Sequence, residues 1–149
     1  MMPQFIKSSE KKRIIEELND KFGIEKLPYL LIKSGKEKVR AFSGNLSKEE
    51  ILQISRLTNI ETIGVYFLKY EDQLRLTIDA LHLLKDQINK NILEINDLEL
   101  HDWLRGKDLE IQVPQGPIIL KYKTDFVGYG KSTGNKIFNY VPKDRRLKK

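Results

Sequence analysis

The chain has 149 residues, of which 40% are hydrophobic, enough for one ordinary domain or two small ones. It contains no cysteine, which excludes disulfides and thiolate metal sites and fits a reducing cytoplasm. No apolar stretch approaches the roughly 18 residues that a membrane-spanning helix needs, and the first residues do not predict a secretory signal. We therefore expect a cytoplasmic protein.

Positive charge is concentrated near the C-terminus. The formal net charge is +6, and residues 115–149 carry nine Lys or Arg against two acids, Asp125 and Asp144. The rest of the chain is close to neutral. Two explanations fit: a solvated lysine-rich surface with a basic tail, or a surface that binds phosphate groups.

The first part of the chain predicts an α+β unit. A helix is expected over residues 8–21, with apolar residues on one face and Gly23 at its end. Residues 27–32 and 38–42 flank a Ser-Gly-Lys turn and predict a hairpin.

A capping box predicts the second helix. Ser47 and Glu50 have the S-x-x-E spacing, and Ile51, Ile54 and Leu57 are expected on the buried face of the helix that follows. The remaining expected elements of this unit are strands over residues 61–69 and 73–78, joined by a turn at 70–72, and a short helix capped by Asp79.

The second part of the chain predicts a small β-barrel with one helix across its mouth. Residues 85–91 are polar and break the apolar pattern, which is typical of a domain junction. The helix is expected to be capped near Asn96, to end at Gly106 and to place Leu98, Trp103 and Leu104 in the core. The expected strands cover residues 92–95, 109–113, 118–122, 126–131 and 136–141, with the tail from residue 143 unstructured.

The sequence disfavours catalysis and metal binding. Neither His82 nor His101 has a second His or Cys at ligand spacing, so no metal site and no cofactor is expected. Residues 128–134 (GYGKSTG) invite comparison with a phosphate loop, but counting back from Gly130 places Asp125 where the first glycine of that loop belongs. A carboxylate there has the wrong charge, and we expect no nucleotide hydrolase.

The interpretation that remains is a surface that binds polyanions. Gly128 and Gly130 are expected on one side of a strand, where they either relieve crowding in the barrel or admit the close approach of another backbone. Lys121 and Lys123 make one strand face basic, and aromatic rings stand near Lys136. Two further cations at the helix end fit phosphate binding or, equally, the helix macrodipole.

These residues carry a resemblance to a known module. The helix followed by Arg105-Gly106-x-Asp108, and later residues 127–130 (VGYG), resemble a PUA domain, the RNA-binding module of pseudouridine synthases and archaeosine transglycosylases. The resemblance covers about residues 92–149. It implies that residues 1–90 fold as an α/β pre-PUA domain and that residues 91–149 fold as a PUA-type barrel.

Two finer resemblances accompany it. Residues 139–146 (NYVPKDRR) are similar to the archaeal version of the PUA-like tail found with Sun/Nop-type rRNA cytosine methyltransferases. Residues 74–81 (LRLTIDAL) are similar to the pre-PUA domain of the Nip-seven-like ribosome-assembly proteins. The catalytic cysteines and cofactor loop of the methyltransferases are missing.

The resemblance implies a non-catalytic protein that binds structured RNA, rRNA or a pre-ribosomal particle, in ribosome biogenesis or rRNA modification. The N-terminal unit is expected to meet a protein such as a methyltransferase or assembly factor. Deleting residues 92–149 is expected to abolish RNA binding and leave a folded fragment. The expected RNA contacts are Arg105, Gly106, Lys107, Lys121, Lys123, Gly128, Tyr129, Gly130, Lys131, Lys136, Tyr140, Lys143, Arg145 and Arg146.

Two rival functions remain open. A protein-interaction adaptor would use the basic tail for solubility alone. An enzyme acting on RNA would need a carboxylate base, and Asp79, Asp102 and Asp108 clustered in a deep pocket would favour it.

Overall fold

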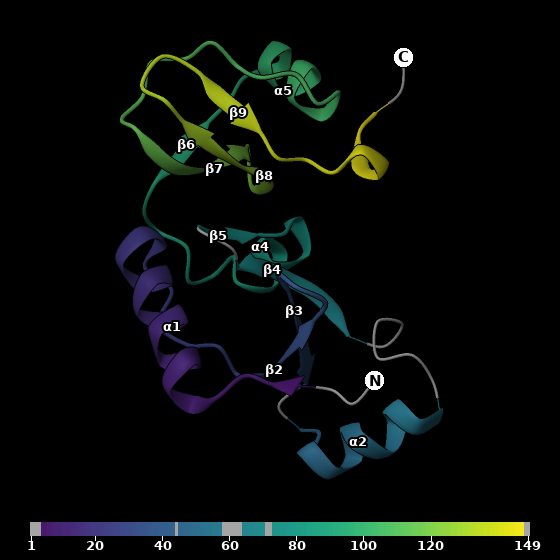
Figure 1. Cartoon of the computed structure of the whole chain (residues 1–149). Helices are drawn as coiled ribbons and strands as arrows, with labels where there is room; N and C mark the ends of the chain where they lie inside the picture. Colours follow the sequence, from purple (N-terminus) through teal and green to yellow (C-terminus); the bar gives the residue numbers. More distant parts are fainter. Residues whose placement is uncertain (1–3, 44, 58–63, 71–72, 148–149) are drawn as a thin grey trace.

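Two β-sheets stacked one above the other form the molecule (Figure 1). The computed structural model describes residues 4–147 except 44, 58–63 and 71–72. The strands are β1 (Gln4–Phe5), β2 (Tyr29–Ser34), β3 (Lys38–Ser43), β4 (Val65–Tyr70), β5 (Leu74–Leu76), β6 (Ile92–Glu94), β7 (Gly116–Tyr122), β8 (Asp125–Ser132) and β9 (Ile137–Asn139). The helices are α1 (Ser8–Phe22), α2 (Lys48–Leu57), α4 (Ile78–Leu83), α5 (Asp97–Leu104) and the 3-10 turn η1 (Lys143–Arg145).

The strand orders confirm a mixed α+β fold. The first sheet has the order β1-β2-β3-β4-β5 and every neighbouring pair is antiparallel. The second has the order β6-β7-β8-β9, with β6 parallel to β7. In the part of the chain that the structure describes, no helix is long and apolar enough to cross a membrane.

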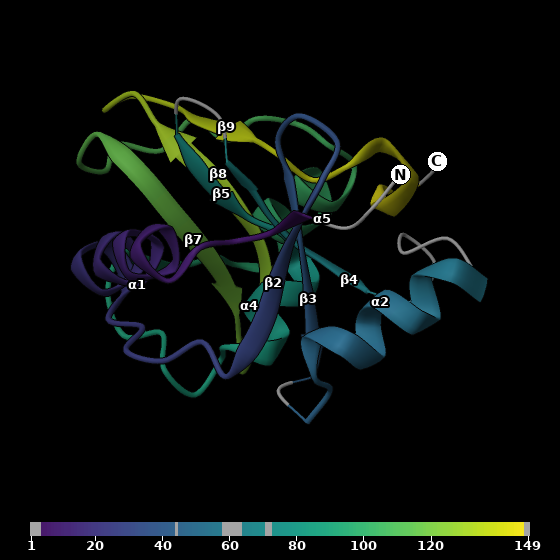
Figure 2. The ribbon, with the colours of Figure 1, turned by 60° about the horizontal axis from the view of Figure 1, so that its bottom comes forward.

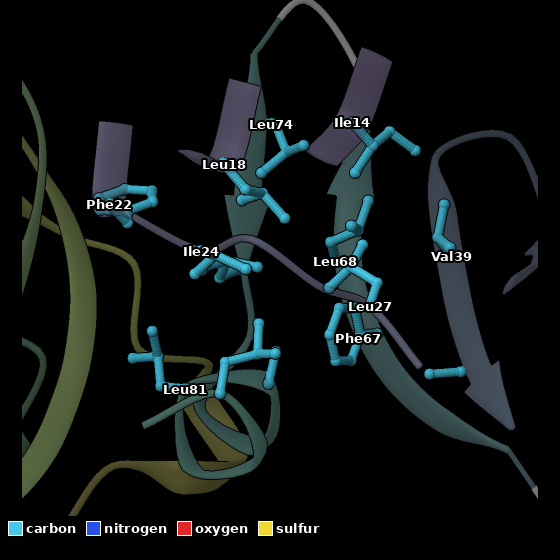
Figure 3. Packing of buried hydrophobic residues seen from close by; sticks show 14 of the residues in the cluster. Ile14, Leu18, Phe22, Ile24, Leu27, Val39, Phe67, Leu68, Leu74 and Leu81 are labelled. Atoms are coloured by element: carbon cyan, nitrogen blue, oxygen red, sulfur yellow. The ribbon is translucent and has the colours of Figure 1, made fainter. Parts of the chain in front are cut away.

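Helix α1 covers the first sheet through one apolar face. Ile14, Leu18 and Phe22 recur at helical spacing, and each is fully buried. Figure 3 shows Ile14 and Leu18 lying on the side of Leu68 and Leu74 of the first sheet. Gly23 ends the helix in the left-handed conformation, with φ of 82°, and its N–H donates to the Asn19 carbonyl. The predicted helix and its end are confirmed.

Helix α2 lies away from the main core. The capping box is confirmed, since the Glu50 N–H donates to Ser47 Oγ and the Ser47 N–H donates to Glu50 Oε1. Ile51 is buried, but Leu57 is 88% exposed. The expectation that Leu57 is buried is wrong, because α1 and α2 lie on opposite sides of β2 and β3, and the far end of α2 extends beyond the sheet (Figure 2).

The helix after β5 starts differently from the prediction. Thr77, not Asp79, caps α4, because its Oγ1 accepts from the Ala80 N–H at 3.2 Å while Asp79 lies in the first turn. The predicted hairpin of β4 and β5 is confirmed where it is described, and its turn at 71–72 and the expected strand residues 61–63 lie outside the described residues.

The polar segment 85–91 is bound to the end of α1 and is not a loose linker. The Asn89 N–H donates to the Phe22 carbonyl, and Asn91 Nδ2 donates to the Lys21 carbonyl at 2.6 Å. Gln87 Oε1 accepts from the backbone N–H groups of residues 25 and 26. These bonds place the second sheet directly against the first.

The two sheets share one hydrophobic core. Ile119, Phe126 and Tyr129 of the second sheet belong to the same buried cluster as Phe22 and Leu74 of the first unit. Each large apolar side chain contributes about 1.5–3 kcal/mol when it is buried. The expectation that residues 1–91 fold alone therefore conflicts with this packing, since the deletion would uncover the cluster.

The second sheet carries α5 on its other face. Asn96 and Glu99 form a capping box, which confirms the start of α5, and Trp103 is fully buried. Leu98 is 73% exposed, so its expected place in the core is wrong: it lies on the solvent side of this short helix.

Two expected strands of the barrel are shorter than predicted. Residues 109–113 form one isolated bridge, Leu109 to Ile137, instead of a strand. A side-chain hydrogen bond joins the end of this segment to β8, because Ser132 Oγ donates to the Val113 carbonyl. Strand β9 ends at Asn139, and the tail turns into η1 where an unstructured tail was expected.

A shared core predicts a single cooperative unfolding transition. Trp103 is the one tryptophan and reports on the second sheet, whereas far-ultraviolet circular dichroism follows both. We expect the two signals to coincide in a urea titration of the full chain, and residues 1–91 alone to show no cooperative transition. Separate midpoints, or a cooperative fragment, would contradict the shared core.

Candidate nucleic-acid interface

Three cations stand in a row across the first sheet. Lys38 of β3 lies opposite Lys69 of β4, and Lys69 lies opposite Arg75 of β5. Like charges directly opposite each other on neighbouring strands destabilise a sheet. A row that costs stability in this way indicates a functional requirement, and the chemistry it suits is an anionic partner.

The cation row lines a cleft between the two sheets, with a volume of about 490 Å³. The first sheet and the start of α4 form one wall, and the segment from β9 to η1 forms the other. Four cations and two anions line the cleft: Lys38, Lys69, Arg75 and Arg145, with Asp79 and Asp144.

Ion pairs hold two of these cations. Lys69 Nζ lies 3.3 Å from Glu37 Oε2. Arg145 Nη2 donates to both carboxylate oxygens of Asp79, at 3.0 and 3.3 Å, and this pair joins η1 to α4 across the cleft. Partly exposed pairs contribute about 0–1 kcal/mol each, so their main effect is to orient the side chains.

Aromatic rings hold the other two cations. Lys38 Nζ lies 5.2 Å from the centre of the Tyr66 ring, and the Arg75 guanidinium carbon lies 4.0 Å from the centre of the Tyr140 ring. Among the residues that the structure describes, no carboxylate lies within ion-pair distance of either cation. Within the described residues, these two cations contact aromatic rings where Lys69 and Arg145 contact carboxylates.

Tyr129 forms the floor of the cleft and joins its walls. Its ring packs edge-on against Phe22 at 5.7 Å and stacks with Tyr140 at 6.4 Å. Its hydroxyl donates to the Leu74 carbonyl at 2.9 Å. Burial, assisted by the negative charge of Glu17, raises the pKa of the Tyr129 hydroxyl above its ordinary value of 10.0.

The raised pKa of Tyr129 predicts a pH-dependent stability. A group whose pKa is higher in the folded state stabilises that state fully below its unfolded pKa, and the contribution is lost as the pH rises above 10. Tyr129→Phe should cost about 1 kcal/mol at neutral pH, from the lost hydrogen bond. Urea titrations above pH 10 should show the wild type losing more stability than Tyr129→Phe. A gap that does not change with pH would contradict the assignment.

The cleft contains three of the residues expected from the sequence to contact RNA: Tyr129, Tyr140 and Arg145. Tyr129 is 5% exposed and acts from the floor. Tyr140 and Arg145 lie beside cations that sequence reasoning did not select, namely Lys38, Lys69 and Arg75.

The expected approach of RNA to Gly128 and Gly130 is not supported, because a side chain of the protein occupies that space. A Cβ at Gly128 would lie 2.5 Å from Trp103 Nε1, and one at Gly130 would lie 3.0 Å from the same indole ring. Trp103 Nε1 also donates to the Val127 carbonyl. Of the two explanations left open, packing inside the sheet accounts for both glycines.

Gly128→Ala should destabilise the fold by about 1–3 kcal/mol, as overpacking in a full core does. Adding Trp103→Phe removes the atom that the new methyl would meet, so the double variant should lose less stability than the two single changes together. Urea denaturation of the four chains measures this coupling. Additive costs would show that Trp103 is not what requires a glycine here.

Residues near the C-terminus of the chain cover the C-terminal end of α5. A Cβ at Gly106, where φ is 88°, would lie 2.4 Å from Arg146 Nε, and that nitrogen donates to the Val141 carbonyl. Arg146 is therefore engaged with the protein. Arg105 caps the end of α5, and Lys107 pairs with Asp102 at 3.6 Å.

The remaining lysines lie at opposite ends of the ladder between β7 and β8. Lys121 and Lys123 flank the hairpin turn, where they lie over the rings of residues 126 and 122. Lys131 and Lys136 flank Phe138 at the other end. Lys143 is exposed on η1. The expected contacts therefore do not form one continuous patch.

Local signals could have revealed part of the cation row. Lys69 and Arg75 lie on the two strands of the predicted hairpin, and the observed register places them opposite each other. The pairing of Lys38 with Lys69 joins strands far apart in the sequence and was not readable. The charge count also drew attention to the C-terminal residues, where the excess of Lys and Arg is larger.

The three aspartates proposed for an enzyme are not gathered in one pocket. Asp79 lines the cleft and pairs with Arg145, while Asp102 lies in α5, Asp108 follows that helix, and both pair with lysines. Within the described residues, no group of three or more His, Asp or Glu is arranged to hold a metal ion.

Comparisons by sequence match the second part of the chain. Residues 90–147 match the family model of the methyltransferase RsmF PUA domain. The chain is 33% identical over 54 residues to ribosomal RNA small subunit methyltransferase F of Vibrio cholerae, covering 35% of this chain and 11% of that protein. The Shewanella oneidensis protein of the same name is 39% identical over 57 residues, covering 36% of this chain and 12% of that protein. The chain thus spans a small part of these bacterial relatives.

One solved structure matches nearly the whole chain. The conserved PUA domain protein from Thermoplasma acidophilum has a TM-score of 0.59 and 16% identity, covering 92% of both chains. At this identity the likeness concerns the fold alone. It extends over both sheets, while the assignment of the first sheet as a pre-PUA domain and the archaeal origin stay predictions.

Proposed function

We propose that residues 90–147 form a PUA domain related to that of Sun/Nop-type rRNA methyltransferases, and that the chain binds structured RNA without catalysing a reaction. The RNA is rRNA or a pre-ribosomal particle, and the process is ribosome biogenesis or rRNA modification.

The observation that carries this proposal is the meeting of two sets of cations in one cleft. The cation row of the first sheet faces Arg145 from the tail of the PUA domain. Lys and Arg side chains neutralise phosphates, and aromatic rings stack on unpaired bases. The cleft holds both kinds of group. The N-terminal unit therefore contributes to RNA binding and is not reserved for a protein partner.

Salt dependence tests this role. Each Lys or Arg that neutralises a phosphate adds about 0.7–0.9 to the slope of log affinity against log salt. The triple variant Lys38→Gln, Arg75→Gln, Arg145→Gln should weaken binding to rRNA fragments and lower that slope by about 2 to 3. Filter binding or fluorescence anisotropy over a salt series measures it, with duplex DNA as the competitor.

The matched control neutralises three exposed lysines outside the cleft: Lys12, Lys26 and Lys85. This variant has the same net charge as the triple variant and should retain nearly the wild-type slope. Equal losses in both variants would reduce the effect to overall charge and contradict the cleft. Equal affinity for duplex DNA would contradict recognition of RNA.

A second candidate function has one observation in its favour. Val65 and Leu83 are 38% and 46% exposed and line one shallow depression beside α4. Apolar side chains gathered at a surface suit a protein partner, as an adaptor that recruits a methyltransferase or assembly factor would need. An adaptor would keep its function when Lys121, Lys123, Arg145 and Arg146 are neutralised.

A further inference from the structure

The shape of the cleft restricts what part of an RNA can enter it. Its volume of about 490 Å³ lies within the range of roughly 300–1,000 Å³ that is typical of sites for small molecules. A duplex presents a far larger surface, whereas one nucleotide outside a stack has the dimensions of a small ligand. The cleft is thus suited to one nucleotide at a time.

The lining offers one group for each part of a nucleotide. The Tyr66 ring and the Arg75 guanidinium, which is stacked on the Tyr140 ring, both line the cleft and offer planar surfaces for a base. Arginine planes and aromatic rings are the surfaces on which unpaired RNA bases stack. Lys38 supplies a cation without a described carboxylate partner, as a phosphate requires.

The Asp79–Arg145 pair bridges the two walls of the cleft. It joins α4 to η1 while leaving Arg145 Nη1 and Nε without a bond to Asp79. An arginine presents five N–H donors, so Arg145 can receive a phosphate on its other edge without releasing Asp79. The walls need not separate for a nucleotide to enter.

We infer that the cleft between the two sheets binds a single unpaired nucleotide of the RNA, with its base against the Tyr66 and Arg75–Tyr140 surfaces and its phosphate on Lys38 and Arg145. This inference rests on the proposed RNA binding and specifies the unit that this site receives. The duplex parts of the same RNA remain outside, where the exposed lysines of the PUA domain meet them.

The test uses three RNA hairpins with the same stem: fully paired, with one bulged nucleotide, and with an abasic residue at the bulge. The full-length protein should bind the bulged RNA about tenfold to a hundredfold more tightly than either of the others, the range that one stacked base provides. A 2-aminopurine at the bulge should change its fluorescence on binding.

Variants separate stacking from charge. Arg75→Lys keeps the positive charge but removes the guanidinium plane, so it should lose most of the preference for the bulge while its affinity for the paired stem stays near that of the wild type. Tyr66→Leu should do the same, and Tyr66→Phe should retain the preference. The control is Phe138→Leu, which removes a 40% exposed ring outside the cleft and should leave the preference intact.

Each outcome decides between the two proposals. RNA binding without preference for the bulge, or a preference that survives Arg75→Lys and Tyr66→Leu, would overturn the nucleotide site and leave RNA binding standing. A preference that depends on Phe138 would move the site to the outer surface and also overturn it. Failure to bind any of the hairpins would overturn the proposed function itself.

Discussion

The packing of Tyr129 between the two sheets is the contact on which the rest of the structure depends. Its ring lies in the cluster that α1 and both sheets share, and its hydroxyl bonds to the Leu74 carbonyl of β5. Leu74 is followed directly by Arg75, and Tyr129 stacks on Tyr140, which carries the Arg75 guanidinium. The contact that joins the sheets therefore also sets the geometry of the cleft.

In the cleft, the positive charges that suit ligand binding also lower the stability of the sheet. The cation row places like charges opposite each other across three strands, which weakens the sheet. The Lys69–Glu37 pair and the rings under Lys38 and Arg75 offset part of this repulsion without neutralising the row. Hydrophobic burial between the sheets, in contrast, is extensive. The fold can accordingly tolerate a charged surface that favours ligand binding and lowers the stability of the folded state.

Local signals in the sequence predicted local structure well. The capping boxes at Ser47 and Asn96 and the end of α1 at Gly23 were readable because each depends on residues within one or two turns. Periodicity could not show what covers an apolar face, so Leu57 and Leu98 were placed in the core although both are exposed.

The site was less predictable because it depends on contacts between distant residues. Of the residues that line the cleft, Tyr140 and Arg145 were selected by the charge and aromatic content of the tail. Lys38 and Arg75 lie on strands far apart in the sequence, and only the register of β3, β4 and β5 brings them together. The two glycines of β8 illustrate the opposite error: a conspicuous pattern whose cause is packing, against Trp103 at Gly128 and against the Phe138 carbonyl, Ile137 and Trp103 at Gly130.

The central claim is that RNA enters the cleft between the sheets, and backbone hydrogen exchange measured with and without an rRNA hairpin tests it most directly. The account predicts slower exchange on binding in β4, β5 and residues 140–145, which come from both walls. Protection confined to the hairpin turn between β7 and β8, or to the surface of α2, would contradict it.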